Sequence, residues 1–166
     1  MTISVRRATI GDAAGIAAVH LASWEGAYRG LVPDAWFEER TLERRTVMWR
    51  RVIGDARASV VFAAEDAGTI VGFSGANTPS RDADADEDTA EISSFYVDPG
   101  HWRAGAGRAL MDASLAELTG RGFETVTLWV FEANPRARAF YAACGFTEDG
   151  ARQGEPPEIR MRRRLS

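Results

Sequence analysis

The chain has 166 residues, 45% of them apolar, with no internal repeat or long linker, so we expect residues 1–166 to form a single domain with a buried core. All twenty basic residues are arginine, and twenty-four acidic residues bring the formal charge to -4, which argues against nucleic acid as a partner. The absence of lysine excludes a Walker-type phosphate loop, a Schiff-base mechanism and a lysine general base.

The N-terminal residues 1–7 lack the apolar core of a signal peptide. No segment of the sequence approaches the roughly 20 apolar residues that span a bilayer. We therefore expect a cytoplasmic protein without a membrane partner.

Near the N-terminus, residues 3–7 alternate weakly between apolar and polar side chains and predict a first strand.

Two helical regions are predicted in the first third of the chain. The first runs from Asp12 to about Trp24 and places His20 on its apolar face, which favours a packed histidine over a catalytic base. The segment from Trp24 to Pro33 is aromatic and punctuated by glycine, and this composition suits a loop over a ligand. A second helical region follows, and the spacing of its apolar residues places Trp49 in the core.

A hairpin and an acidic segment come next. Residues 59–64 and 69–76 are rich in strand-forming residues and are separated by a turn over residues 65–68. The acidic run at residues 81–88 predicts a solvated loop, with attraction of a cationic substrate as the alternative. It lacks the glycine and the terminal glutamate of a calcium-binding loop.

The middle of the chain predicts an anion site. A strand over residues 92–97 stops at Pro99, and a glycine-rich segment then leads into an amphipathic helix that reaches about Leu118. Gly105 and Gly107 remove side chains from the first helical turn, so its unpaired N–H groups and the positive end of the helix dipole can approach a pyrophosphate. The third glycine or alanine of a dinucleotide-binding fingerprint is missing, which disfavours a Rossmann fold.

The last third predicts one more helix among strands. A strand over residues 125–131 precedes a helix that starts at Asn134, where asparagine caps and proline follows, and that ends at Gly145. Two final strands, over residues 146–152 and 158–164, complete a mixed α/β pattern with helices on both faces of the sheet. These final strands offer an edge for a homodimer.

The helix after Asn134 carries the most reactive side chains. Asn134 and Tyr141 are seven residues apart, which is two helical turns, and therefore share one face. A phenol with a pKa of about 10 stays protonated at neutral pH and can donate a proton; a packed helix tyrosine is the alternative. Cys144 is the one cysteine, and we expect it to be a packed, inert thiol.

Three segments together carry a family resemblance. They are residues 91–99 with the following Gly105-x-Gly107-Arg108, residues 134–141 with Gly145-Phe146, and residues 24–33 with residues 43–45 and Trp49. In these segments the chain resembles the GNAT superfamily of acetyl-CoA-dependent N-acetyltransferases over nearly its whole length. The resemblance implies an α/β (α+β) fold with a mixed, mostly antiparallel central sheet of about seven strands, a splay between strands 4 and 5 for the pantetheine arm, and helices on both faces.

The resemblance also implies a set of cofactor contacts. Backbone groups of Phe95 and Val97 would pair with the thioester end and the arm, and amides of the glycine-rich loop would hold the pyrophosphate. The family usually has glutamine or arginine at the position of Trp102, so the side-chain contacts of this loop are expected to differ. The expected cofactor-binding residues are Phe95, Tyr96, Val97, Arg103, Ala104, Gly105, Ala106, Gly107, Arg108, Asn134 and Tyr141.

Catalytic roles follow from the chemistry of acetyl transfer to an amine. Tyr141 is the expected acid, and the N–H of Phe95 is the expected oxyanion donor. Glu91 is the candidate general base, directly or through a water, with a merely solvated carboxylate as the alternative. Asn134 has two competing roles, as helix cap and as a contact to pantetheine.

The acceptor is the least determined part. Four aromatic residues are candidate walls of its pocket, with core packing as the alternative: Trp24, Tyr28, Trp129 and Phe131. Glu25 and the acidic run suggest a cationic amine. We expect an N-acetyltransferase that moves the acetyl group directly to a primary amine of a small molecule or peptide in a ternary complex, without a metal. The alternatives are a non-catalytic acyl-CoA-binding module on the same fold and a nucleotide-binding protein of another class.

Overall fold

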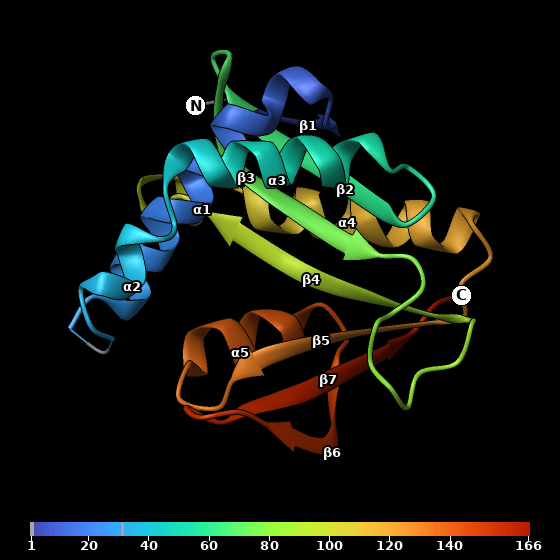
Figure 1. Ribbon diagram of the computed structural model, residues 1–166. Coiled ribbons are helices and arrows are strands. Elements are labelled where there is room, and N and C mark those ends of the chain that lie inside the picture. Colours follow the sequence, from blue (N-terminus) through green and yellow to red (C-terminus); the bar gives the residue numbers. More distant parts are fainter. Residues whose placement is uncertain (1, 31) are drawn as a thin grey trace.

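The computed structural model describes residues 2–30 and 32–166, which are organised around a seven-stranded sheet (Figure 1). The order across the sheet is β1-β2-β3-β4-β5-β7-β6. Only the β4–β5 pair is parallel among these neighbours, and the other pairs are antiparallel, which confirms the predicted mixed sheet. The strands are β1 (Ile3–Arg7), β2 (Ser59–Asp66), β3 (Thr69–Asn77), β4 (Thr89–Val97), β5 (Thr125–Phe131), β6 (Thr147–Gln153) and β7 (Glu158–Arg164).

Helices cover both faces of the sheet, as predicted. One apolar cluster joins α1 and α3 to the face that carries Val61 and Phe73. The other joins α4 and α5 to the face that carries Val60, Leu128 and Met161. Within the described residues, no helix has the length and apolar character that crossing a membrane requires. The helices are α1 (Ala13–Tyr28), α2 (Ala35–Glu38), α3 (Leu42–Gly54), α4 (Ala106–Gly120) and α5 (Pro135–Ala143), with 3-10 turns at Ile10–Asp12 and Pro99–His101.

The ends of the helices follow from capping residues. Thr41 accepts a hydrogen bond from the N–H of Arg44 and starts α3, and Asn134 does the same for Ala137 at the start of α5. Gly145 has a φ of 90°, the left-handed conformation that ends a helix, as predicted for α5.

The first helix is longer than the sequence predicts. The segment expected to form a loop from Trp24 is helical as far as Tyr28, while Leu31 of that segment lies outside the described residues. Trp24 and Tyr28 are one helical turn apart, and both contact the ring of Trp36, so aromatic packing stabilises an additional turn of helix. The first part of the segment expected to cover a ligand is therefore a helix face rather than a loop.

The predicted hairpin forms with longer strands. Its turn consists of Ala67 and Gly68, with φ values of 50° and 81°. Two consecutive residues with positive φ match the right-handed twist of the flanking strands, so β2 and β3 extend to the turn itself.

The sheet opens between β4 and β5. The two strands pair in parallel from Thr89–Thr125 to Ile92–Leu128, and beyond this last pair they diverge (Figure 1). β5 continues to pair with β7 as far as Phe131, so only its pairing with β4 is lost in the opening. We call this opening the seam; it is the separation of strands 4 and 5 that was predicted.

A bulge in β4 lies where the seam begins. Gly75 of β3 pairs with Ser94, whereas Ala76 pairs with Ile92, so Ser93 is an extra residue in β4. Because the bulge resets the alternation of side chains, Ile92 and Phe95 pack on the α4/α5 side of the sheet.

Candidate active site

The seam brings the predicted site residues together from two sides. Ile92 packs on the α4/α5 side, so its neighbour Glu91 points to the α1/α3 side. Phe95 lies with Ile92, and Tyr96 packs against the α1/α3 cluster. The candidate base is therefore on one face of the sheet, and the ring of Phe95 is on the other.

Tyr141 lies at the seam on the α4/α5 side. It is 9% exposed, and its ring contacts Phe95 at 6.1 Å and Phe146 at 6.2 Å between centroids. Burial, and then the nearby Tyr96, raise the pKa of Tyr141 above its ordinary value, so the phenol keeps its proton at neutral pH. Within residues 2–30 and 32–166 the structure records no hydrogen bond of its hydroxyl, which leaves that O–H available to a ligand.

The predicted anion loop has an open helix terminus. Gly105 is the N-cap of α4 with a φ of 88°, and no side chain caps the helix. Nothing lies within 4 Å of the position where a side chain on Gly105 would begin. The amides of the first turn of α4 therefore lack a side-chain cap, which suits an anion. Arg103 in the same loop also has a positive φ, of 63°.

Gly107 and Arg108 have roles in packing besides the predicted one. A Cβ on Gly107 would lie 3.3 Å from the ring of Phe140, so this glycine allows α4 and α5 to approach closely. The guanidinium of Arg108 donates to the carbonyl oxygen of Ala143 at 3.3 Å and pairs with Asp112 at 3.4 Å. Its side chain is thus committed to the helices, and only its amide remains for the loop.

Trp102 links the end of β4 to α5. Its indole Nε1 donates to the carbonyl oxygen of Val97 at 2.8 Å. The guanidinium of Arg136 stacks on the indole with Cζ 3.1 Å from the ring centroid. The unusual tryptophan therefore has a defined structural role, and the carbonyl of Val97 already accepts a hydrogen bond before any cofactor is considered.

Asn134 serves as a helix cap. Its Oδ1 accepts a hydrogen bond from the N–H of Ala137 at 3.1 Å. The oxygen takes part in the cap, and the side-chain NH₂ group remains for a contact with a ligand.

Glu91 is half-buried and held by the loop between β3 and β4. Its Oε1 accepts from Ser80 Oγ at 3.2 Å and from the N–H of Arg81 at 3.3 Å. It pairs with Thr127, one residue before the last β4–β5 pair, so it borders the seam rather than lying in its open part.

The acidic run forms a mostly exposed loop, as predicted, and a buried arginine pairs with part of it. Arg160 of β7 is 7% exposed and donates to both carboxylate oxygens of Asp84 at 2.7 Å, to Asp149 at 2.7 Å and to Asp82 at 3.3 Å. We call these four residues the charge clasp. It ties the loop between β3 and β4 across β5 and β7, while most of the acidic run remains exposed.

The charge clasp connects to Glu91. The N–H of Asp82 donates to Ser80 Oγ at 3.1 Å, and the same hydroxyl donates to Glu91. Trp129 belongs to this group because its indole N–H donates to both oxygens of Asp82 at 3.1 Å. Of the four predicted wall residues, Trp129 is thus bound to the acidic loop.

The other three wall residues form one aromatic surface with a tryptophan that the sequence did not single out. Trp36 lies 5.4 Å from Trp24 and 5.5 Å from Tyr28 between ring centroids, and Tyr28 lies 5.6 Å from Phe131 of β5. We call Trp24, Tyr28, Trp36 and Phe131 the aromatic wall. Helices α1 and α2 and strand β5 thereby converge on the α1/α3 side of the seam.

His20 connects the aromatic wall to β4. Its ring lies 4.1 Å from Trp24 and 5.2 Å from Tyr96, and its Nδ1 accepts the indole N–H of Trp49 at 3.2 Å. Burial, and then the charge of Arg45, lower the pKa of His20 to about 3. As expected, this is a packed, neutral histidine.

The sequence analysis missed two functional candidates. Glu158 pairs with Phe131 in the sheet. Burial is the main cause that raises the pKa values of Tyr28 and Tyr96, and the charge of Glu158 raises them further. A second carboxylate therefore lies near the aromatic wall. Arg160 lies between Ile159 and Met161, so strand alternation alone would have placed it on the opposite face from the α4/α5 core.

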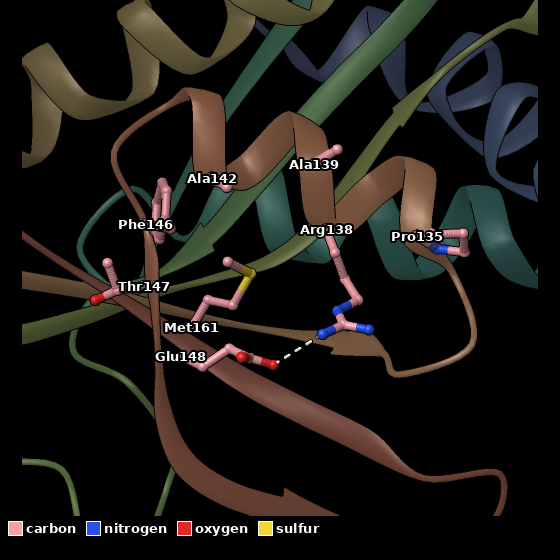
Figure 2. A pocket seen from close by; sticks show the side chains of 8 residues that line it. All are labelled: Pro135, Arg138, Ala139, Ala142, Phe146, Thr147, Glu148 and Met161. Atoms are coloured by element: carbon pink, nitrogen blue, oxygen red, sulfur yellow. Dashed lines mark hydrogen bonds and ion pairs between the residues drawn. The ribbon is translucent and has the colours of Figure 1, made fainter.

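A hollow of about 490 Å³ lies outside this site. Figure 2 shows it between α5 and the start of β6, crossed by the ion pair of Arg138 and Glu148 at 3.1 Å. Neither Tyr141 nor Glu91 lines it, so it is separate from the seam. Cys144 at the end of α5 is buried, and burial raises the pKa of its thiol, as expected for an inert cysteine. In the part of the chain that the structure describes, no three His, Cys, Asp or Glu side chains are grouped to hold a metal ion.

Comparison with known proteins adds a family match. The model of the family described as acetyltransferase (GNAT) matches residues 21–146. A mycothiol acetyltransferase of Thermobispora bispora is 43% identical over 86 residues, which are 52% of this chain and 29% of that protein, so the chain spans less than a third of this relative. The N-acetyltransferase YuaI of Bacillus subtilis is 29% identical over 141 residues, 85% of this chain and 78% of that protein.

The fold has a similar counterpart among crystal structures. The PaiA N-acetyltransferase of Thermoplasma acidophilum, in complex with coenzyme A, superposes with a TM-score of 0.80 at 20% identity. The superposition covers 99% of each chain. At this level of identity the likeness concerns the fold.

Proposed function

This chain belongs to the acetyltransferase (GNAT) family, and from that premise we propose that it transfers the acetyl group of acetyl-CoA directly to a primary amine of a small molecule or peptide. The reaction takes place in a ternary complex at the seam. The relatives named N-acetyltransferase and mycothiol acetyltransferase support transfer to an amine or to a small-molecule acceptor.

The single observation that carries the proposal is the seam itself. It lies between β4 and β5, next to the uncapped N-terminus of α4 and beside the protonated phenol of Tyr141. An anion-binding helix terminus, an opened strand and a proton donor are the three features that a long thioester with a pyrophosphate requires. Acetyl-CoA supplies the acetyl thioester, and the amides from Arg103 to Arg108 would hold its pyrophosphate.

The residues at the seam divide the chemistry between the two faces of the sheet. Glu91 on the α1/α3 side accepts a proton from the incoming ammonium, directly or through a water. The N–H of Phe95 donates to the oxygen that becomes negative during transfer. Tyr141 on the α4/α5 side donates its proton to the leaving sulfur. The aromatic wall lies on the same side as Glu91, so the amine reaches the seam from that side.

Replacing Tyr141 with Phe tests the acid role. The variant should lower kcat by about 100-fold because a positioned general acid contributes 10²–10⁴-fold, while acetyl-CoA affinity changes little. Tyr28→Phe is the matched control: it removes the same atom from the aromatic wall, and it should alter the acceptor KM more than kcat. Release of free thiol over a panel of amines measures both variants. Full kcat in Tyr141→Phe would remove the acid role.

Ligand-induced stabilisation tests the cofactor. A ligand at 100 times its dissociation constant stabilises the native state by about 2.7 kcal/mol, so acetyl-CoA should raise the melting temperature while ATP and NAD at equal concentration should not. Stabilisation by ATP or NAD alone would indicate a nucleotide-binding protein of another class. Stabilisation by acetyl-CoA without thiol release from any amine would indicate a non-catalytic acyl-CoA-binding module.

A further inference from the structure

Two arginines lie on the aromatic wall. The guanidinium of Arg45, from α3, stacks on Trp24 with its Cζ 4.2 Å from the ring centroid. The guanidinium of Arg40 stacks on Trp36 at 3.7 Å. Because these two rings are 5.4 Å apart, the two positive charges share one surface. Both side chains are half-buried.

Neither of these arginines has a carboxylate partner in the described part of the chain. Arg40 donates to the carbonyl oxygen of Trp36 at 2.8 Å. Arg45 reaches only the sulfur of Met48, at 3.0 Å, and its buried Nε has no hydrogen-bond partner. A third stacked arginine of the same region, Arg29, differs because it pairs with Glu25 at 2.9 Å.

An uncompensated charge of this kind is costly to keep. Burial, and then repulsion from Arg40, lower the pKa of Arg45 from its ordinary value. Stacking on an indole offsets only part of the cost of removing a guanidinium from water. Two guanidiniums without an anion, beside a candidate substrate site, offer the donors that a carboxylate or phosphate ligand requires.

The position of Arg45 relates it to the proposed reaction. Trp24, on which it stacks, lies 4.1 Å from His20, and His20 lies 5.2 Å from Tyr96 of β4 at the seam. Glu91 and Glu158 provide the carboxylates on the same side of the sheet. A surface with arginines at one end and carboxylates at the other suits a molecule that carries both an anion and an ammonium.

We propose that Arg45, together with Arg40, binds an anionic group of the acceptor, a carboxylate or a phosphate, while the amine of the same molecule points to the seam. The position of the amine rests on the proposed transferase function, whereas the binding of the anion does not depend on it. The acceptor is then zwitterionic, as an amino acid, a peptide or a phosphorylated amine is. Three of the acidic residues that suggested a cationic acceptor have partners within the chain, since Glu25 pairs with Arg29, and Asp82 and Asp84 pair with Arg160.

Anion binding is measured first without any acetyl transfer. Acetate, glutarate and inorganic phosphate are titrated into the full chain by calorimetry at constant ionic strength, with chloride as the reference. The wild type should bind a carboxylate or phosphate, and Arg45→Met should weaken that binding at least tenfold. Arg50→Met is the matched control, because Arg50 is an exposed residue of the same helix. Equal binding by the wild type and Arg45→Met, or no binding by the wild type, overturns the proposal.

Two further comparisons identify the anion and the mode of binding. The ratio of acetate to phosphate affinity distinguishes a carboxylate site from a phosphate site. Arg45→Lys keeps the charge but loses the planar fork, so its affinity should lie between those of the wild type and Arg45→Met. Thermal melting of each variant checks that it folds. A lysine variant as weak as the methionine variant, with a native melting temperature, still supports a site that depends on the guanidinium fork.

Matched amines separate this proposal from the transferase function. β-Alanine and its amide differ only in the anion, as do phosphoethanolamine and ethanolamine. The wild type should have a KM at least tenfold lower for the anionic member of one pair, and Arg45→Met should abolish that preference with little change in kcat. Acetylation without such a preference refutes the anion site and leaves the transferase intact. Anion binding without acetylation of any amine refutes the transferase and leaves the anion site intact.

Discussion

Two arginines on one side of the sheet have opposite electrostatic surroundings. Arg160 is buried in the charge clasp among three carboxylates. Arg45 lies on the aromatic wall and forms no ion pair with any described residue. Both are far from the usual state of an arginine, which is exposed to water.

The difference separates a structural charge from an available one. In the clasp every donor group of Arg160 has an acceptor, so the residue fixes the loop that holds Glu91 and has little capacity left for a ligand. On the wall, π-stacking holds the guanidinium of Arg45 but leaves its charge unneutralised. A buried arginine thus indicates ligand binding only when the chain itself supplies no carboxylate partner for it.

The strongest way to break this contrast is to remove Arg160. Arg160→Met should destabilise the fold by roughly 3 kcal/mol, because it leaves the carboxylates of the clasp close together without their cation. Arg162→Met is the control: Arg162 is more exposed and contacts only Asp149, so its loss should cost less than about 1 kcal/mol. Urea denaturation of both variants gives the two values. Equal losses would mean that the clasp has no special role.

The pH dependence of stability should separate the two regions. On the wall side, the folded pKa of His20 is about 3, against an ordinary value of 6.5. Below pH 6.5 the unfolded chain binds a proton at this residue, whereas the folded chain does not. The contribution of neutral His20 to stability is therefore present above pH 6.5 and is lost on acidification. The wild type should lose roughly 2 kcal/mol between pH 7.5 and pH 5 through this residue.

His20→Gln isolates that contribution, since glutamine can still accept the indole N–H of Trp49 but does not titrate. The difference between the wild type and His20→Gln should change between pH 7.5 and 5. His101, whose pKa is raised by Asp98 against an opposing effect of burial, affects both proteins equally. A difference that stays constant over this range would show that His20 protonates as easily in the folded state as in the unfolded state.

The clasp should respond at lower pH. Hydrogen bonds from Arg160 lower the pKa of Asp84; for Asp149 burial acts to raise the pKa, but the N–H of Ala151 and the guanidinium of Arg160 outweigh it and lower it. Groups with depressed folded pKa values contribute stability above their unfolded value, here 3.8, and lose it as the pH falls further. The difference between the wild type and Arg160→Met should therefore be constant from pH 7.5 to 5 and shrink below about pH 4.

The smallest effect is expected for Arg45. Arg45→Met should change the free energy of unfolding by less than about 1 kcal/mol, because the lost stacking on Trp24 is offset by relief of an unpaired, half-buried charge. The same urea experiment gives the value, with Arg50→Met beside it. A loss as large as that of Arg160→Met would place Arg45 among the residues that hold the fold, and the contrast between the two arginines would disappear.

Most of the fold followed from local patterns. The glycine-led helix α4, the capped helix α5 and the hairpin of β2 and β3 depend on residues whose conformational preferences are strong and local, such as Gly105, Asn134 and Gly68. The predicted end of α1 was wrong because the last turn of this helix is stabilised by contacts with Trp36, which lies beyond the helix in the sequence. Tertiary packing of this kind has no periodic signal.

The site was predictable in its outline but not in its charges. The placement of Glu91, Phe95 and Tyr141 around one opening could be inferred from the motifs that surround them. The clasp could not, because it joins Asp82 and Asp84 to Arg160, which is more than seventy residues away. Nor could the surroundings of Arg45, since a sequence shows which charges exist but not which of them lack a partner.

The bulge at Ser93 determines which residues the seam presents to either side. It directly follows the last pair between β4 and β5, and it directs Phe95 towards Tyr141 and Tyr96 towards His20. A regular strand of the same residues, without the bulge, would exchange the two rings, so that each faced the wrong layer. The irregular pairing at Ser93 therefore decides which layer each of the two rings enters.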